Sequence, residues 1–401
     1  MPRAATSSTR RFRRRSPKAG DRFVNRDYAS TLKTIAKDGA ESFYRGSIAR
    51  RIADDMARNG GLITVDDLAQ YRAIERRPLS GRYRGHQIYS APPPVSTGAT
   101  LLETLQILEN YRPTAGTTYA SDADYLHYAI ESWRVRDQGP RIADPALWDV
   151  SLGPHLDPSH AATLFKRIDP KKVFRDRSSP AADAPPERIG RGTTAFAVVD
   201  ADGNMIAVTQ TLSTWGGTFY VSDGLGFLYN NHLRVGGGGG APGRFLPLAR
   251  SSSTSAPTLV FRASGSSTAV GSPRLAVGAA GNNWIPASVY EIILNVIDGG
   301  LDAQRAIEAP RFLISRNPAD PSGSRLQIED RIPRSVLQDL TARGHRFQKI
   351  GRKGEVRYGY AAAAVVDSAR REVQGGAEPR RSHAAVAVKP ATTPPGARHH
   401  D

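Results

Sequence analysis

The sequence predicts an α+β protein, because helical and strand-like patterns dominate different parts of the chain. From Asp27 to about Asn110 apolar residues recur mainly at helical spacing. From residue 193 onward the pattern becomes strand-like, with short runs rich in β-branched residues and a few helices between them. Residues 169–192 separate the two patterns and are rich in proline and charge, which is typical of an exposed linker.

The helices of the first part have recognisable ends. Ser47 can cap a helix that stops at Gly60-Gly61. Thr64 and Asp67 have the spacing of a capping box for a short helix. Further helices are expected around Leu101–Leu108, after the proline run 92–94, and over Ala123–Arg134.

The clearest strand signal is a hairpin. The runs TTAFAVVD and MIAVTQTL flank Ala201–Asn204, and Asp202-Gly203 tolerates the positive φ angles of a tight turn. A two-residue turn places Thr211 opposite Thr194, whereas one bulge places it opposite Thr193. Other elements expected are strands near 258–262, 274–278, 346–350 and 360–366, and helices near 286–297, 302–309 and 334–342.

Composition argues against several functional classes. The net charge of +17 is concentrated partly in an arginine-rich segment over residues 1–19, which indicates a solvated tail rather than a nucleic-acid interface. No apolar run has the length of a membrane span. The absence of cysteine excludes thiolate chemistry, and the nine histidines lack the H-x-x-x-H spacing of many zinc enzymes. The sequence therefore predicts no nucleic-acid or membrane partner, no metal and no other cofactor.

The junction between linker and strand offers a specific chemistry. Cleavage of the Gly192–Thr193 bond would leave Thr193 with a hydroxyl and a free α-amine on one residue. The amine, with a pKa near 8, can accept the hydroxyl proton, so that nucleophile and base are joined. A threonine pair at the start of a strand also has an ordinary explanation, which is β-propensity.

Two later segments fit the same kind of site. Residues 251–255 form a dense group of hydroxyls before a strand, although composition alone favours an ordinary loop there. Residues 278–283 form a small-residue loop that leads into a helix. Such a loop can present backbone N–H groups to an oxyanion, or can simply allow close packing.

Several long blocks resemble the γ-glutamyltranspeptidase family. The stretch from SFYRGSIARR to LLETLQILENY is similar to the later half of the family's large subunit. TTAFAVVDADGNMIAVTQTL, LYNN, SSSTSAPT, NVIDGGLDAQRAIEAPRF and GAEPRR resemble successive blocks of its small subunit. Together these blocks cover roughly residues 20–385.

The resemblance implies an N-terminal-nucleophile hydrolase fold, a four-layer αββα sandwich formed by a precursor that cleaves itself into large and small subunits. It implies Thr193 as nucleophile, Thr211 as the threonine that supports its amine, and no cofactor. Gly281 and Asn282 match the glycine pair of the oxyanion hole, where the N–H of Asn282 still serves if its φ angle permits. Residues implied to contact a small-molecule substrate are Ser213, Asn231, His232, Ser253 and Thr254.

The resemblance also implies a division of the chain. The expected segments are a basic tail over 1–19, a mainly helical part of the large subunit over 20–168, the linker 169–192 before the cleavage site, a small subunit over 193–388, and a tail over 389–401. The family's large subunit normally begins with a longer segment that supplies further strands. Without those strands, sheet edges and apolar faces are expected to be bare.

Departures from the family pattern bear on the substrate. Ser213 replaces an asparagine, and His232 replaces a glutamine. Val235 stands where the family has the acid that pairs with the α-ammonium group of a glutamyl donor. The resemblance as a whole implies an amidohydrolase or acyltransferase that cleaves γ-glutamyl amides of glutathione type. The departure at Val235 argues against a donor that carries an α-ammonium group. Two alternatives are an acylase for glutaryl or cephalosporin side chains, and an inactive remnant of the family.

Overall fold

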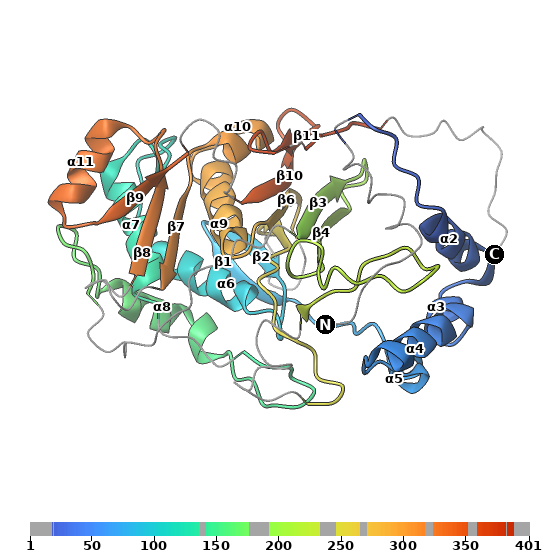
Figure 1. Cartoon of the computed structure of the whole chain (residues 1–401). Coiled ribbons are helices and arrows are strands. Elements are labelled where there is room, and N and C mark those ends of the chain that lie inside the picture. The colour runs from blue at the N-terminus through green and yellow to red at the C-terminus, as the bar shows by residue number, and fades with distance from the viewer. Residues whose placement is uncertain are drawn as a thin grey trace. The chain divides into compact units, whose positions relative to one another are not determined.

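The chain combines helices with mainly antiparallel sheets, which confirms the predicted α+β class. It forms two compact units. The computed structural model describes residues 18, 20–136, 142–175, 192–232, 246–264, 271–316, 324–351, 359–381 and 383–388. The first unit comprises Met1–Arg77 and Thr211–Val235, and the second comprises Pro78–Gln210 and Gly236–Asp401 (Figure 1). Both units therefore draw on both sides of the Gly192–Thr193 bond, and the predicted division into subunits at that bond stays a prediction.

Four helices make up most of the first unit: α2 (Arg26–Asp38), α3 (Glu41–Tyr44), α4 (Ser47–Asn59) and α5 (Val65–Gln70). The capping box of Thr64 and Asp67 is present at the start of α5, as predicted. Gly60 ends α4 in the left-handed conformation, also as predicted.

The predicted cap at Ser47 is wrong. Gly46 is the N-cap of α4, and Ser47 is already helical. The reason is a close approach between α3 and α4. A Cβ at position 46 would lie 2.7 Å from the Cα of Ser42, so only glycine fits the turn.

The loop that follows β4 completes the first unit. Leu225 is fully buried against Ile48 and Ile52 of α4. The Thr31 hydroxyl of α2 donates to the carbonyl of Leu225 at 2.9 Å. The loop is thereby fixed to two helices although about 190 residues separate them in sequence.

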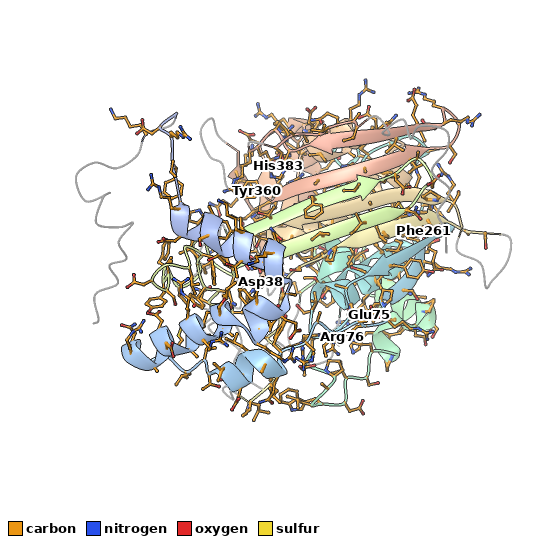
Figure 2. All side chains as sticks on the ribbon, turned by 90° about the vertical axis from the view of Figure 1, so that its right-hand side faces the viewer. Asp38, Glu75, Arg76, Phe261, Tyr360 and His383 are labelled. Carbon is orange, nitrogen blue, oxygen red and sulfur yellow. The ribbon has the colours of Figure 1, made fainter. Side chains whose placement is uncertain are left out.

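A six-stranded antiparallel sheet forms the centre of the second unit, in the order β1-β2-β5-β6-β10-β11. Its strands are β1 (Leu79–Tyr83), β2 (His86–Ser90), β5 (Thr258–Arg262), β6 (Pro273–Ala280), β10 (Tyr360–Asp367) and β11 (Glu372–Ala377). The predicted strands near 258–262, 274–278 and 360–366 are confirmed. Figure 2 shows the strands with their side chains, with Tyr360 labelled at the start of β10 and Phe261 in β5.

A two-stranded sheet, β3 (Thr193–Val199) and β4 (Met205–Thr211), packs on β6 and β10. It is the predicted hairpin, and its turn has three residues. The N–H of Gly203 donates to the carbonyl of Asp200 at 3.2 Å, and the N–H of Asp200 donates to the carbonyl of Asn204 at 3.1 Å. Gly203 is left-handed, with φ of +84°. The turn places Asp200 opposite Asn204, and the same register continued along both strands sets Gln210 opposite Thr194 and Thr211 opposite Thr193.

Helices cover the other face of the large sheet. The helices α6 (Thr97–Leu108), α9 (Trp284–Ile297) and α10 (Ala303–Glu308) pack on it and bury the main apolar core. The second unit is thus layered as helices, six-stranded sheet and hairpin. The hairpin's outer face is exposed in the part of this unit that the structure describes, with Phe196, Val198 and Ile206 about half exposed.

The remaining elements of the second unit flank this core. They are α7 (Ala123–Arg134), the 3-10 turn η1 (Pro154–Leu156), α8 (Pro158–Phe165), α11 (Arg334–Ala342) and a three-stranded sheet of β7 (Phe312–Arg316), β8 (Ser324–Glu329) and β9 (Phe347–Ile350). No helix among the described residues is long and apolar enough to cross a membrane.

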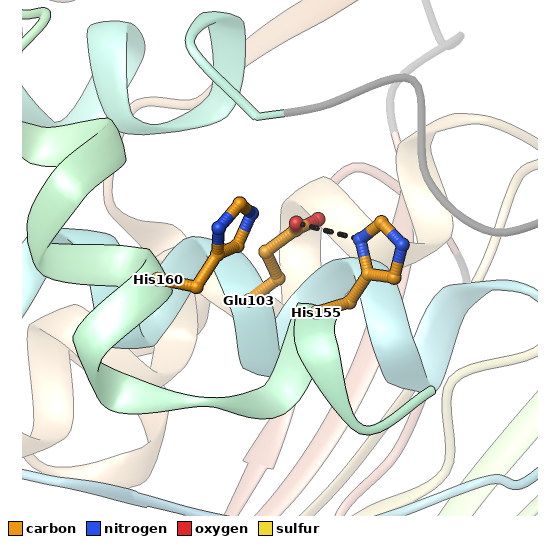
Figure 3. Close-up of side chains that lie close together, drawn as sticks. All are labelled: Glu103, His155 and His160. Carbon is orange, nitrogen blue, oxygen red and sulfur yellow. Dashed lines mark hydrogen bonds and ion pairs between the residues drawn. The ribbon is translucent and has the colours of Figure 1, made fainter. Parts of the chain in front are cut away.

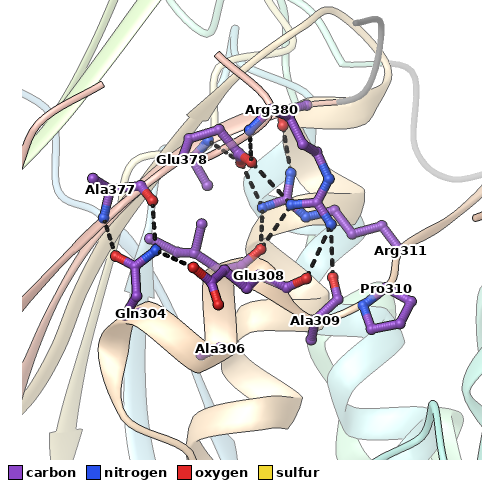
Figure 4. Close-up of polar contacts among 12 residues, drawn as sticks. Gln304, Ala306, Glu308, Ala309, Pro310, Arg311, Ala377, Glu378 and Arg380 are labelled. Atoms are coloured by element: carbon purple, nitrogen blue, oxygen red, sulfur yellow. Dashed lines mark hydrogen bonds and ion pairs between the residues drawn. The ribbon is translucent and has the colours of Figure 1, made fainter. Parts of the chain in front are cut away.

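A buried ion-pair network explains the GAEPRR block. Glu378 pairs with Arg311 at 2.8 Å and with Arg380 at 2.9 Å, and Arg380 also pairs with Glu329 at 2.6 Å (Figure 4). Burial by itself would raise the pKa of Glu378, but the two arginines outweigh it and lower the pKa. The network ties β11 to the segment that joins α10 and β7.

Candidate active site

Four segments of the second unit meet at one end of its stacked sheets. Thr258, the first residue of β5, pairs with Val277, and Tyr360, the first residue of β10, pairs with Ala280. Ala195 of β3 lies over the same end of β6, since a Cβ built on Gly278 would lie 3.4 Å from its Cβ. The start of β3, which is Thr193, and the loop after β6, which is Gly281-Asn282, therefore belong to the same end of the two sheets.

The Gly281-Asn282 loop is shaped to receive an anion. Both residues have positive φ, +117° and +58°. Their carbonyls accept from the N–H groups of Trp284 and Ile285, so the loop turns directly into α9. Within the described part of the chain, the N–H groups of Gly281 and Asn282 donate to no other group, and both residues are only partly buried. Adjacent N–H groups of this kind are suited to an oxyanion.

Close packing holds this loop in place. A Cβ on Gly281 would lie 3.1 Å from the Cα of Gly359, and a Cβ on Gly359 would lie only 2.1 Å from the Ser288 hydroxyl. The carbonyl of Gly359 accepts a short hydrogen bond from buried Arg311. The ion-pair network of Figure 4 thus reaches the strand that backs the loop.

Two of the residues predicted to contact the substrate, Ser253 and Thr254, precede β5 and are half-buried. The carbonyl of Ser253 accepts from the N–H of Ser96 at 3.2 Å, and its hydroxyl lies 2.9 Å from that of Ser255. The start of α6 therefore fixes the backbone of the serine segment. Since this segment leads into the first residue of β5, it approaches the same end of the sheet as Gly281.

The other predicted residues lie together in the first unit. The Thr211 hydroxyl accepts from the N–H of Ser213 at 2.9 Å, and Ser213 has φ of +77°. The Asn231 side chain exchanges hydrogen bonds with Thr214, at 3.1 Å to its N–H and 2.6 Å from its hydroxyl. The His232 ring lies 3.4 Å from the carbonyl of Thr211. Thr211, Ser213, Asn231 and His232 are thus brought together, and their contact with a substrate stays a prediction.

A buried carboxylate anchors the loop that carries these residues. Asp55 of α4 accepts from the hydroxyls of Tyr220 at 2.5 Å and Ser222 at 2.6 Å. Burial alone would raise the pKa of Asp55, but these two hydrogen bonds and nearby Arg58 outweigh it and lower the pKa. Sequence patterns gave no sign of this anchor, because 165 residues separate Asp55 from Tyr220.

Some predicted positions lie outside the described residues. These are Val235 and its neighbour Arg234, the tail residues 1–17, 19 and 389–401, and residues 176–191 of the linker.

Two groups of histidines and carboxylates were not found from the sequence: His127, Glu131 and His345, and Glu103, His155 and His160. The two histidines of the first group belong to a linear chain of hydrogen bonds that runs from Arg134 to Asp169. Arg134 donates to Nδ1 of His345, so Nε2 of His345 must donate to Nδ1 of His127 at 2.8 Å. Nε2 of His127 then donates to the carbonyl of Asp169 at 2.8 Å. Both imidazoles are therefore neutral, and all four ring nitrogens are used.

Comparisons with known proteins agree on one family. The family model described as gamma-glutamyltranspeptidase matches residues 5–388. The glutathione hydrolase proenzyme of Escherichia coli (strain K12) is 34% identical, with 82% of this chain and 56% of that protein covered. The Acylase ACY 1 proenzyme of Pseudomonas sp. (strain SE83) is 33% identical, with 82% and 55% covered. The chain thus spans a little over half the length of these two relatives.

The solved structures extend the likeness to the fold. The cephalosporin acylase from Bacillus halodurans superposes with a TM-score of 0.78 at 25% identity, covering 94% of this chain and 65% of that one. The fold is therefore the N-terminal-nucleophile hydrolase fold that the sequence blocks implied.

Proposed function

The chain belongs to the gamma-glutamyltranspeptidase family, and from this premise we propose that it is an amidohydrolase with Thr193 as N-terminal nucleophile. Its donor is an amide of the γ-glutamyl, glutathione-like type, and its acceptor is water or an amino group. The observation that carries the proposal is the pair of N–H groups at Gly281 and Asn282. They are without a partner in the described chain and belong to the sheet end at which β3 begins with Thr193.

The proposed reaction starts with cleavage of the Gly192–Thr193 bond, which frees the α-amine of Thr193. The amine takes the hydroxyl proton while Oγ1 attacks the amide carbonyl carbon, and the carbonyl oxygen becomes an oxyanion. The N–H groups of Gly281 and Asn282 stabilise that oxyanion.

Collapse of the tetrahedral intermediate then breaks the C–N bond. The leaving amine takes the proton from the Thr193 ammonium group, which leaves an ester on Oγ1. Water or an amino acceptor attacks the ester carbon and passes its proton to the α-amine. The bond from Oγ1 to the acyl carbon then breaks, Oγ1 takes that proton back, and the acid or the new amide leaves.

The register of the hairpin supports a role for Thr211. The register of the three-residue turn, continued along both strands, sets Thr211 opposite Thr193, which supports a role for its hydroxyl beside the amine. The hydroxyl of Thr211 accepts from Ser213, so its own proton is directed elsewhere. In the proposed reaction, that proton is donated to the uncharged amine.

A sequence observation favours a second candidate, a glutaryl-type acylase. Val235 stands where an acid pairs with the donor's α-ammonium group, and Arg234 beside it has the same sign as that group. A glutaryl donor lacks this ammonium group and loses nothing. The 33% identity to an acylase proenzyme is in line with this candidate.

The test compares kcat/KM for matched γ-glutamyl and glutaryl anilides. Activity on either should be lost in Thr193→Ala and kept in the neighbouring Thr194→Ala. Turnover that survives Thr193→Ala contradicts the proposed nucleophile, and a folded chain that turns over neither anilide indicates an inactive remnant.

The ratio of the two substrates decides between the candidates. An unpaired ammonium costs about 1–3 kcal/mol, so the acylase candidate predicts a glutaryl preference of about 10- to 100-fold. Val235→Asp should shift the preference back toward the γ-glutamyl donor. A γ-glutamyl preference of tenfold or more in the natural chain would rule out the acylase candidate.

A further inference from the structure

Glu103, His155 and His160 form a group that the proposed reaction does not use. One ligand atom from each lies within 4.8 Å of the others, and Figure 3 shows the three side chains pointing toward one another from three elements. We propose that this group binds a divalent transition-metal ion of the Zn²⁺ type, with two imidazoles and one carboxylate as ligands.

The spacing of the ligand atoms fits such an ion. Bonds of about 2.0–2.1 Å in a tetrahedral site place ligand atoms about 3.3–3.4 Å apart. A carboxylate oxygen of Glu103 lies 3.2 Å from Nδ1 of His155. Two of the three ligands thus already have the required separation, and the ligand atom of His160 lies within 4.8 Å of both.

The backbone that carries the histidines is held against α6. Pro154 begins the turn η1 and Pro158 begins α8, and each restricts the backbone beside a histidine. The Gln106 amide of α6 donates to the carbonyl of Leu156 at 3.0 Å, one helical turn from Glu103. Ala161 and Leu164 of α8 pack in one apolar cluster with Ile107 of α6. The backbone on which the two histidines lie is therefore already held in place without a metal ion.

The charges also suit a cation. The Glu103 side chain is only 3% exposed, and its second oxygen lies 3.9 Å from the guanidinium of Arg136. The two oxygens thus have different neighbours, with one near Arg136 and the other facing Nδ1 of His155. His155 and His160 are partly exposed, so a fourth position is open to water.

The other histidine group is a poor competitor. All ring nitrogens of His127 and His345 are used in the linear chain described above, so an ion there would have to break that chain. Imidazole and carboxylate ligands are those that Zn²⁺ and Co²⁺ accept.

Titration of the full chain with Zn²⁺ and Co²⁺ tests the proposal. His399 and His400 at the end of the sequence can bind metal by themselves, so the reference protein carries alanine at both. After treatment with a chelator, this protein should bind one equivalent of Zn²⁺. Co²⁺ should give the intense visible absorption of a four-coordinate site.

Variants locate the ion and separate binding from folding. His155→Ala, His160→Ala and Glu103→Gln should each weaken Zn²⁺ binding at least tenfold and remove the rise in melting temperature that Zn²⁺ causes. His86→Ala, a histidine of β2 outside the group, should leave both unchanged. Circular dichroism of the metal-free variants checks the fold, and Glu103→Gln keeps the side-chain shape should a histidine variant fail to fold.

The contact between Glu103 and His155 also has a metal-free explanation, which is an ion pair with a protonated histidine. That explanation predicts no stoichiometric Zn²⁺ binding to the reference protein. Its absence, or binding that survives His155→Ala and His160→Ala, would overturn the proposal. Neither outcome affects the assignment of Thr193.

Discussion

At the scale of single residues, the conformation of Asn282 decides whether the second oxyanion donor is present. The family pattern has glycine at this position, and the sequence alone left the φ angle open. The structure gives φ of +58°, in the left-handed region that asparagine tolerates better than most residues. The replacement therefore keeps the N–H in place.

Substitutions at this position test that reasoning. Asn282→Gly should retain activity, because glycine adopts the same φ without strain. Asn282→Val should lower kcat by tenfold or more, since a left-handed valine costs about 1–2 kcal/mol and displaces the N–H. Steady-state kinetics on both variants, with melting temperatures measured in parallel, provide the comparison. Equal kcat values would show that the Asn282 N–H is not a donor in the reaction.

Candidate site residues could be predicted from the sequence only where they stand in a block of consecutive residues that resembles the family. Thr193, Thr211, Ser253 and Thr254 stand in blocks that resemble a family. The anchor Asp55 and the trio at Glu103 could not be predicted, because their partners come from segments 50 to about 170 residues away. Pairing over such distances follows from the packing of elements and leaves no periodic signal.

At the scale of elements, most helices and the central strands were predictable, and the strands β1 and β2 were not. Residues 79–90 lie in a stretch interpreted as mainly helical, and each strand is only five residues long. Their pairing depends on β5, whose Val260 lies opposite Ile88. The strands β7, β8 and β11 were missed as well, although β7 pairs with β8 and β11 pairs with β10, its neighbour in the sequence.

The buried ion pairs of Glu378 join β11 to the segment between α10 and β7, and a measurement of stability can test their contribution. Arg311→Met removes a buried cation and leaves Glu378 with one partner, so it should lower the free energy of unfolding by about 3–5 kcal/mol. Arg331→Met is the matched control. Arg331 pairs with Glu329 but is half exposed, and its loss should cost at most about 1 kcal/mol. Urea denaturation of both variants that shows equal losses would contradict the structural role of the network.

The histidine chain predicts how stability depends on pH. Burial first, with Arg134 and His127 adding to it, lowers the pKa of His345 to about 2, and burial also lowers the pKa of His127. In the unfolded chain both imidazoles titrate near pH 6.5, so between pH 6.5 and 2 the unfolded state binds more protons. Stability should therefore fall as the pH falls below about 6.5, by up to about 1.4 kcal/mol per pH unit for each histidine.

His345→Gln separates this effect from other titrations. Glutamine can still accept from Arg134 and donate to His127, but it does not titrate. Its unfolding free energy, measured between pH 7 and 5, should depend less steeply on pH than that of the unaltered chain. Identical slopes would mean that His345 is not kept neutral by the fold.

At the scale of the whole molecule, the family blocks predicted the fold better than any local pattern. Covering helices, central sheet and hairpin correspond to three of the four expected layers of the αββα sandwich. Phe196, Val198 and Ile206 are about half exposed and alternate with partly or fully buried positions on the hairpin, and the predicted bare face stays a prediction. The division into two units could not be predicted, because it joins the first helices to residues beyond 210.

The central claim concerns the whole chain, since an N-terminal threonine exists only after the chain is cut. Intact-mass spectrometry of the purified protein tests it most directly. The 43.3 kDa chain should give two pieces of 192 and 209 residues, about 21 and 23 kDa in proportion to length. Thr193→Ala should remain a single chain, and Thr194→Ala should still be cut. A folded protein that hydrolyses the amide while its mass remains that of one uncut chain would contradict the account.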